Sequence, residues 1–504
     1  MMLGASLSGG CLKKAAPGCG HGGGGEAAAR LLELERPCRV PSSRQLVTAA
    51  LPLPLSFRAA FGANWCTKAI AAAHSGRRSN RVVRRKRVVA EIELFSSDDF
   101  DVERFLGSQG YINVSSYTPP QPGSSMFGAA LGENAPLGMD QRDLNRIGGQ
   151  EVGEGSVQTR LYAGRIGRGE RMGTRVILKA YPAMVTSGSD ADVMAANELA
   201  AHVVLQDEEL GEISENISYL YGGFQTKTGE QWLVFRDDGK ATAADYAKMA
   251  AEATTEGRAV GEWDFWDRFD KTRPIQRRLI FITKLLRGAF QGLAYIHSRG
   301  RLHQSLGPAS IVINTTSERD AMYLNARLRD LAFSTDVSSG LAAFGGPTLE
   351  DLWEGRGSNL SSGTRDSAID PAVAKLSEGL WRRAAMAGAR DSLSRRSFGI
   401  ADDIYAGGLL LAYMVFVPLS EAGSIDGPSI QRLLETTFRL DIPAVREYCE
   451  ADDRWSEAVN FMNLDDGAGW QLLQAMLNPD YRLRPTVDAV LSHRFLTGAL
   501  LNLS

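Results

Sequence analysis

Two glycines, a lysine and a glutamate are the first residues whose types and spacing could bind a charged ligand. Gly153 and Gly155 lie in a Gly-Glu-Gly-Ser stretch, where backbone N–H groups can approach phosphate oxygens without interference from a Cβ atom. Lys179 lies near the end of a β-rich run over 175–180, and Glu198 follows in an Ala-rich segment expected to be helical. A buried ion pair between them would be costly unless both charges were used. The alternative for the two glycines is a plain hairpin that binds no ligand. The alternative for Lys179 and Glu198 is that each lies on an exposed face, the lysine on a strand and the glutamate on a helix.

A second group of polar residues follows an apolar helical pattern, between Leu302 and Asn314. This stretch resembles the catalytic loop of eukaryotic protein kinases, H-R-D-L-x-x-x-N, because it keeps His303, Leu306 and the following Pro308. The groups that carry the chemistry in that family are replaced here: Gln304 stands for the arginine, Ser305 for the catalytic aspartate, Gly307 for the usual lysine and Ser310 for the metal-binding asparagine.

The same resemblance assigns roles to the first group of residues. Gly153 and Gly155 match the first two glycines of the kinase G-x-G-x-x-G loop, whereas Gln158 replaces the third. Lys179 matches the lysine of the V-A-I-K strand and would contact the α and β phosphates of ATP. Glu198 matches its partner on the small-lobe helix. The resemblance therefore implies ATP as a cofactor.

Further motifs follow in the order of the family, as far as Phe495. Asp330, in Asp-Leu-Ala where the family has D-F-G, would bind Mg²⁺. Phe235 would border the back of the adenine pocket, and Asp403 resembles the aspartate that ties the catalytic loop to the central helix of the large lobe. Between Asp330 and Asp403 we find no A-P-E motif, and we expect the Gly/Ser/Arg-rich stretches 355–367 and 390–397 to form a mobile loop.

The elements that must position these residues can be recognised from periodicity. Apolar residues recur at steps of three and four along one helix face just before the catalytic loop, at Leu279, Ile282, Leu286, Phe290, Leu293 and Ile296. Together with the motif order, they imply an α+β protein with the bilobal protein kinase fold. We expect a small antiparallel β lobe with one helix and a larger, mainly helical lobe.

The N-terminal segment differs in composition from the rest of the chain. Up to Ala90 it contains 15 Lys/Arg and only 3 acidic residues, although the whole chain has a net charge of -3. An unfolded, basic, acid-poor leader is typical of organelle transit peptides, and we expect the chloroplast, with the mitochondrion as the alternative. A disordered basic tail or a nuclear signal would have a similar composition.

We therefore expect three regions: a transit peptide or disordered tail at 1–90, an extension and linker with little structure at 91–152, and a kinase-like domain at 153–498. Four of the five cysteines fall in the first region, which leaves Cys449 in the body. The longest apolar run, 407–419, is shorter than the roughly 20 residues of a membrane span. We expect no transmembrane segment and no nucleic-acid partner.

The replaced catalytic groups favour a pseudokinase that binds ATP and acts as a scaffold or regulator for a protein client or partner kinase. The alternative is an active, atypical Ser/Thr protein kinase of plastid proteins, which would use Asp330 and a rearranged carboxylate such as Glu318 or Asp320. A third interpretation is a structural interaction module with an occluded pocket. The sequence does not indicate the client or the oligomeric state.

Overall fold

The computed structural model describes residues 93–111, 157–183, 190–207, 211–239, 241–256, 260, 272–337 and 371–498. They belong to one compact unit that begins at Arg85. The predicted transit peptide, the glycines Gly153 and Gly155, and the stretch 355–367 lie outside the described residues, so the predictions about them remain predictions.

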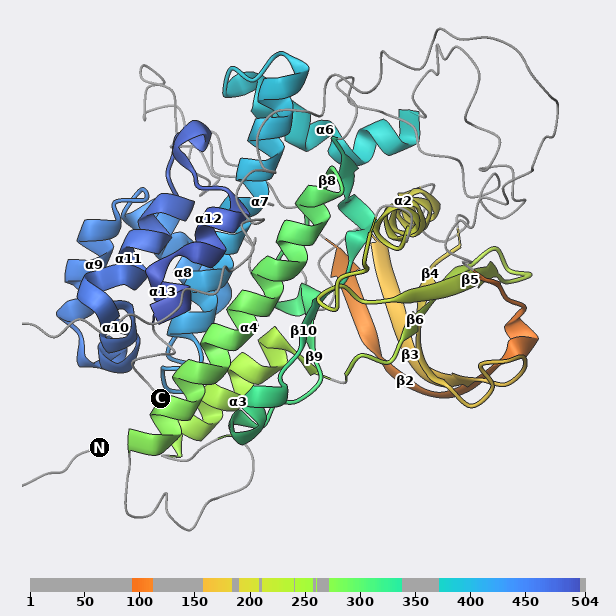
Figure 1. Ribbon diagram of the computed structural model, residues 1–504, viewed down its shortest axis with the longest axis horizontal. Coiled ribbons are helices and arrows are strands. Elements are labelled where there is room, and N and C mark those ends of the chain that lie inside the picture. The colour runs from red at the N-terminus through yellow and green to blue at the C-terminus, as the bar shows by residue number, and fades with distance from the viewer. Residues whose placement is uncertain are drawn as a thin grey trace, which may run out of the picture. The chain divides into compact units, whose positions relative to one another are not determined.

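A six-stranded sheet in the order β1-β5-β6-β4-β3-β2 forms the small lobe (Figure 1). Its neighbouring strands are antiparallel, except that β1 and β5 are parallel. Side chains of a strand alternate between the two faces of the sheet, so both faces of this sheet contribute to a core. The strands are β1 (Glu93–Leu94), β2 (Phe100–Tyr111), β3 (Val157–Ile166), β4 (Arg175–Tyr181), β5 (Leu220–Gln225) and β6 (Gln231–Arg236).

Strands β1 and β2 correct the prediction that residues 91–152 have little structure and that the domain begins at 153. Strand β2 pairs with β3 along its whole length, and its Phe100 ring stacks on Phe224. The sequence of β2 lacks a regular alternation because it contains charged residues and two glycines. Tertiary pairing overrides that weak local signal. The small lobe therefore begins before residue 100.

Helix α2 (Asp190–Leu205) packs on one face of this sheet, against β4 and β6 (Figure 1). The alternation of β4 directs Val176 and Leu178 into the core on the opposite face, and Ile177 and Tyr181 toward α2. Lys179 has the same parity as the latter pair, which places it on the helix side of the sheet.

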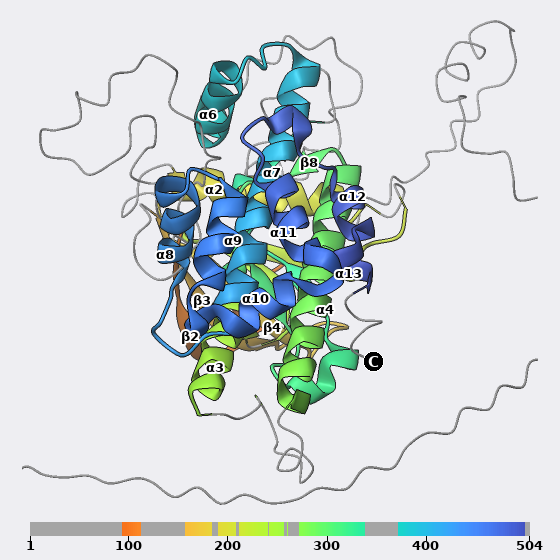
Figure 2. The ribbon, with the colours of Figure 1, turned by 90° about the vertical axis from the view of Figure 1, so that its left-hand side faces the viewer.

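The large lobe is mainly helical. Its central helices are α4 (Thr272–Ser298) and α7 (Ser392–Phe416), and one large apolar cluster surrounds them. Both have the length and apolar content of a membrane span, but 67% and 94% of their most apolar windows are buried within the protein. Helices α9, α10 and α11 lie side by side in both views (Figure 1, Figure 2). The remaining helices are α3 (Ala243–Thr255), α6 (Pro371–Met386), α8 (Gly427–Arg432), α9 (Ile442–Glu450), α10 (Ser456–Met462), α11 (Leu464–Met476), α12 (Val487–Ser492) and α13 (Arg494–Gly498).

Helix α7 corrects the prediction of a loop over 390–397. Its N-terminus lies in that stretch, because Asp391 caps it by accepting hydrogen bonds from the backbone N–H groups of Leu393 and Ser394. The helix thus begins about four turns before the apolar run 407–419.

Short strands, of which β8 to β11 follow α4 in the chain and β7 precedes α3, carry the predicted catalytic segment. Strands β7 (Ala241–Thr242), β9 (Ile311–Ile313) and β10 (Ala326–Leu328) form one small sheet, and β8 (Arg301–Leu302) pairs with β11 (Thr335–Asp336). Three 3₁₀ turns lie among them: η5 (Pro308–Ser310), η6 (Glu318–Tyr323) and η7 (Leu331–Phe333). In the part of the chain that the structure describes, a β lobe with one helix and a mainly helical lobe confirm the predicted bilobal kinase fold.

Candidate nucleotide site

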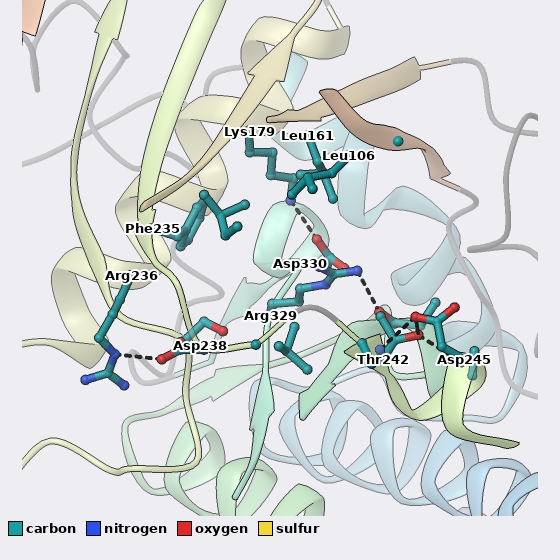
Figure 3. A pocket seen from close by; sticks show the side chains of 18 of the residues that line it. Leu106, Leu161, Lys179, Phe235, Arg236, Asp238, Thr242, Asp245, Arg329 and Asp330 are labelled. Carbon is teal, nitrogen blue, oxygen red and sulfur yellow. Dashed lines mark hydrogen bonds and ion pairs between the residues drawn. The ribbon is translucent and has the colours of Figure 1, made fainter. Parts of the chain in front are cut away.

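A cavity of about 480 Å³ lies where the small-lobe sheet meets α3 and the catalytic segment (Figure 3). Its volume is within the range of small-molecule sites, about 300–1,000 Å³. Leu161 and Ile177 of the sheet and Val312 of β9 supply apolar walls, which suit a flat ring such as a nucleobase. Its charged lining residues are Arg104, Lys179, Glu198, Arg236, Asp238, Asp245, Lys248, Arg329 and Asp330.

Lys179 and Glu198 form the predicted ion pair. Lys179 is only 2% exposed, and its ammonium lies 2.9 and 2.8 Å from the two carboxylate oxygens of Glu198. The Tyr181 hydroxyl also donates to Glu198, and the backbone N–H of Leu331 donates to it at 3.2 Å. Because both charges of this buried pair have partners, the desolvation penalty is offset. The pair fixes α2 against the sheet and against η7.

Asp330 completes a buried triad with that pair. Its Oδ1 lies 2.7 Å from the Lys179 Nζ, and its Oδ2 lies 3.2 Å from the Nε of Arg329 (Figure 3). Its backbone is left-handed, with a φ of 67°, a conformation that aspartate and asparagine tolerate better than most residues. The cavity thus brings together Lys179, Glu198 and Asp330 as predicted, with an arginine that the sequence reasoning missed.

These contacts do not fit a magnesium site, which was the predicted role of Asp330. Mg²⁺ requires oxygen ligands in near-octahedral geometry, and two cationic side chains already contact the carboxylate. The hydroxyl of Ser310, the predicted substitute for the second ligand, donates to Gly307 O and accepts from Gly307 N, which closes the η5 turn. In the described ranges, no group of three or more His, Cys, Asp or Glu side chains could hold a metal ion.

Ser305 occupies the position of the catalytic aspartate but does not line the cavity. The side chain is 1% exposed, and its hydroxyl donates a hydrogen bond of 2.6 Å to the backbone carbonyl of Asp330. It therefore ties the catalytic loop to the Asp330 segment and offers no carboxylate to a substrate. Gly307 likewise supplies no cation.

Asp403 holds the catalytic loop in place, as predicted. Its carboxylate accepts hydrogen bonds from the backbone N–H groups of His303 and Gln304, at 2.7 and 2.9 Å, and lies 2.9 Å from the His297 Nε2. Gln304, whose backbone is left-handed at a φ of 61°, also donates its side-chain amide to Asp403. The loop of a kinase is thus preserved without its catalytic groups.

The cavity roof contains a glycine of β2, and the prediction for Gly153 and Gly155 stays untested. Leu106, Gly107 and Ser108 of β2 line the cavity, whereas Gly153 and Gly155 lie outside the described residues. A signal for this strand was present, because the stretch 106–111 reads Leu-Gly-Ser-Gln-Gly-Tyr and contains two closely spaced glycines. The Pro/Gly/Ser-rich sequence that follows it obscured the pattern.

The segment that joins the two lobes begins with Phe235, which is 7% exposed and lines the cavity as predicted. Arg236 and Asp238 then form an ion pair of 2.6 Å. A Cβ atom on Gly239 would lie 2.1 Å from the Ile313 carbonyl oxygen, and its φ is 149°. Only glycine allows the backbone to pass so close to β9.

His202 lies one turn after Glu198 on α2 and is fully buried. Its ring packs edge-on against Phe235, and neither ring nitrogen has a well-aligned hydrogen bond, because the amide of the neighbouring Gln206 bonds to the backbone of Leu220. Burial, aided by the nearby Lys179 ammonium, lowers the pKa of His202 from 6.5 to about 3. The imidazole is therefore neutral and behaves as a core side chain behind the cavity.

The carboxylates suggested as a replacement base lie elsewhere. Glu318 is 1% exposed and is paired with Arg278 at 2.7 Å, with the Tyr246 hydroxyl at 3.2 Å from the same oxygen. Asp320 is exposed on η6, and neither residue lines the cavity. This part of the prediction is wrong, because Glu318 is the centre of a buried network that joins α3, α4 and η6.

Two curated proteins are similar to the chain in sequence. The serine/threonine-protein kinase STN8, chloroplastic, of Arabidopsis thaliana is 24% identical over 270 residues, which are 51% of this chain and 46% of that protein. The serine/threonine-protein kinase STN7, chloroplastic, of the same organism is 24% identical over 310 residues, which are 60% of this chain and 50% of that protein. The chain spans about half the length of these relatives.

No protein-family model matches the sequence. The crystal structure of a Stt7 homolog from Micromonas algae soaked with ATP superposes with a TM-score of 0.41 and 18% identity. The superposition covers 68% of this chain and 90% of that chain. This TM-score is too low for the superposition to bear on fold or function.

Proposed function

We propose that the chain, a member of the protein kinase superfamily by its fold and its similarity to STN8 and STN7, is a nucleotide-binding pseudokinase of the chloroplast. Both relatives are named as chloroplastic. The basic, acid-poor segment before residue 90 supports the same compartment for this chain.

The cavity supports nucleotide binding. Its apolar walls would take the base, and the Lys179 ammonium would contact the phosphates. Glu198 holds that ammonium on the cavity side of α2, and Asp403 holds the floor of the cavity through the catalytic loop. ATP is the ligand that this arrangement fits best.

One observation carries the proposal that phosphoryl transfer is absent: Ser305 is buried and hydrogen-bonded to the Asp330 carbonyl. A kinase needs a carboxylate here to accept the proton of the substrate hydroxyl, and general bases of this kind contribute roughly 10²- to 10⁴-fold to the rate. The neighbouring positions, Gly307 and Ser310, supply neither the cation nor the amide oxygen of a kinase. With these groups gone, a scaffold or regulatory role toward a protein client or partner kinase follows.

The second candidate is an active serine/threonine protein kinase, and the activity in the names of both relatives favours it. Such an enzyme would use the intact triad of Lys179, Glu198 and Asp330 with a base other than Glu318 or Asp320.

Nucleotide binding and turnover separate the two candidates. We expect ATP to raise the thermal unfolding midpoint of the full chain by several degrees, because ligand at 100 times its Kd stabilises by about 2.7 kcal/mol. Lys179→Met should abolish that shift, whereas the matched variant Lys227→Met, in an exposed turn, should retain it. With radiolabelled ATP and generic protein substrates, we expect no transfer above the Lys179→Met background. Transfer that is lost in both Lys179→Met and Asp330→Asn would establish the kinase instead.

Localisation has its own test. A fluorescent protein fused after residues 1–90 should enter the chloroplast. A fusion that stays in the cytosol or enters mitochondria would contradict the proposed compartment.

A further inference from the structure

Besides Lys179, a second cationic side chain, Arg329, contacts Asp330 at the cavity wall. The guanidinium of Arg329 lies with its Nε 3.2 Å from Asp330 Oδ2, and its Nη2 donates a 3.0 Å hydrogen bond to the Ala309 carbonyl. Ala309, Arg329 and Asp330 all line the cavity. Arginine cannot lose its proton in a protein, so this positive charge is permanent.

Arg329 is positioned by its neighbours. The residue lies between β10 and η7, its backbone N–H donates to the Ser310 carbonyl at 3.0 Å, and its carbonyl is 3.1 Å from the His303 Nε2. The backbone is therefore fixed to the catalytic loop on both sides. The side chain is 17% exposed, which leaves the guanidinium in contact with both the protein and the cavity.

One donor of this guanidinium makes an ion pair but no well-aligned hydrogen bond. The Nε–H of Arg329 is buried, and its contact with Asp330 lacks the alignment of a hydrogen bond. Buried donors are nearly always satisfied in native proteins, so a donor without a well-aligned acceptor at a cavity wall offers a position for a ligand oxygen. Phosphate oxygens are the acceptors that arginine binds best, because its planar donors match their geometry.

We propose that the cavity binds its nucleotide without a divalent cation, and that the Arg329 guanidinium takes the place of the metal beside the phosphates. This inference rests on the proposed function, since it requires that a nucleotide enters the cavity. It explains why the magnesium ligands do not fit: Asp330 balances the charges of Lys179 and Arg329, and Ser310 closes a turn.

The charge of the cavity supports this assignment. Arg104 of β2 and Lys248 of α3, both exposed, also line it, so the lining carries five cationic side chains against the four carboxylates of Glu198, Asp238, Asp245 and Asp330. Free ATP carries more negative charge than its magnesium complex. The excess of positive charge in the lining therefore favours the metal-free form.

The test is the affinity for ATP, measured by isothermal titration calorimetry in excess EDTA and in excess Mg²⁺. We expect wild-type protein to bind ATP in EDTA at least as tightly as in Mg²⁺. Arg329→Met keeps the apolar stem, and it should weaken binding in EDTA at least tenfold. The matched control is Arg287→Met, because Arg287 also donates to a backbone carbonyl but lies outside the cavity lining; it should bind as the wild type does.

Asp330→Asn distinguishes the two roles of that carboxylate. At a magnesium site, loss of the charge would weaken binding. Here it should tighten ATP binding in EDTA, because a negative charge near the phosphates is removed and Lys179 is released toward the ligand. Asparagine also tolerates the left-handed backbone at this position. Unfolding midpoints without nucleotide show which variants are folded.

The outcomes separate this inference from the function on which it rests. Binding that occurs only in Mg²⁺ would overturn the inference and leave the nucleotide-binding pseudokinase in place. No binding in either condition would overturn both. Two results would refute only the role given to Arg329. One is a folded Arg329→Met variant that binds ATP in EDTA as tightly as the wild type does, and the other is a folded Asp330→Asn variant that binds ATP more weakly.

Discussion

Replacement of His202 by leucine should remove much of the acid sensitivity of the small lobe. The folded protein keeps this buried imidazole neutral, with a pKa of about 3, whereas the unfolded chain has the ordinary value of 6.5. Below pH 6.5 the unfolded chain takes up a proton that the folded chain refuses, so stability falls as the pH falls. The contribution is complete above pH 6.5 and is lost progressively toward pH 3.

The size of the effect follows from the shift. Each pH unit below 6.5 removes about 1.4 kcal/mol from the free energy of unfolding, which gives about 2 kcal/mol at pH 5. Leucine fills a similar volume and does not titrate. It also removes two ring nitrogens that have no well-aligned hydrogen bond, so we expect no loss of stability at pH 7.5.

Urea unfolding followed by tryptophan fluorescence at pH 7.5, 6 and 5 measures this difference. We expect wild type and His202→Leu to diverge by about 2 kcal/mol at pH 5 relative to pH 7.5. Val203→Leu, a partly buried neighbour on the same helix, is the control and should follow the wild type. Parallel pH profiles for wild type and His202→Leu would refute the account of a neutral imidazole without a well-aligned hydrogen bond.

Three further substitutions test the cavity walls and the loop. Ser305→Asp should not restore phosphoryl transfer in a radiolabel assay and should cost at least about 2 kcal/mol in urea unfolding, because it buries a carboxylate against the Asp330 carbonyl; measurable transfer would contradict this. Asp403→Ala leaves two buried backbone N–H groups without an acceptor and should cost about 3–5 kcal/mol by the same measurement, so a loss below 1 kcal/mol would be inconsistent with its anchoring role. Gly239→Ala places a Cβ atom against the Ile313 carbonyl and should lower both the thermal unfolding midpoint and the affinity for ATP. An unchanged affinity would show that the close approach of the Gly239 backbone to β9 does not shape the cavity.

Motif order allowed one ion pair of the small lobe and one anchor of the large lobe to be predicted well. The pairing of Lys179 with Glu198 and the anchoring of the catalytic loop by Asp403 follow from residues that occur at recognisable positions in sequence. Such residues are constrained by local elements, a strand end and a helix face, whose periodicity is visible without coordinates.

The parts that were missed depend on contacts between distant segments. Strand β2 has weak intrinsic strand character and is held by pairing with β3, across a long interval of sequence. The position of Arg329 beside Asp330 depends on a side-chain conformation fixed by the Ala309 carbonyl, which no sequence pattern encodes. The burial of Glu318 likewise becomes apparent only when α3 and α4 are seen to enclose it.

Strand β2 also has a consequence for the behaviour of the protein in solution. It forms the outer edge of the sheet, and a shortened protein that began at residue 153 would expose the backbone N–H and C=O groups of the ten-residue β3. Unpaired edges of this kind recruit strands from other molecules and promote aggregation. When β2 is present, it is the edge strand instead, and it carries the exposed charges of Asp101, Glu103 and Arg104. Such charges disfavour pairing with strands of other molecules. These side chains therefore help to keep the small lobe soluble, a role separate from that of the cavity beneath them.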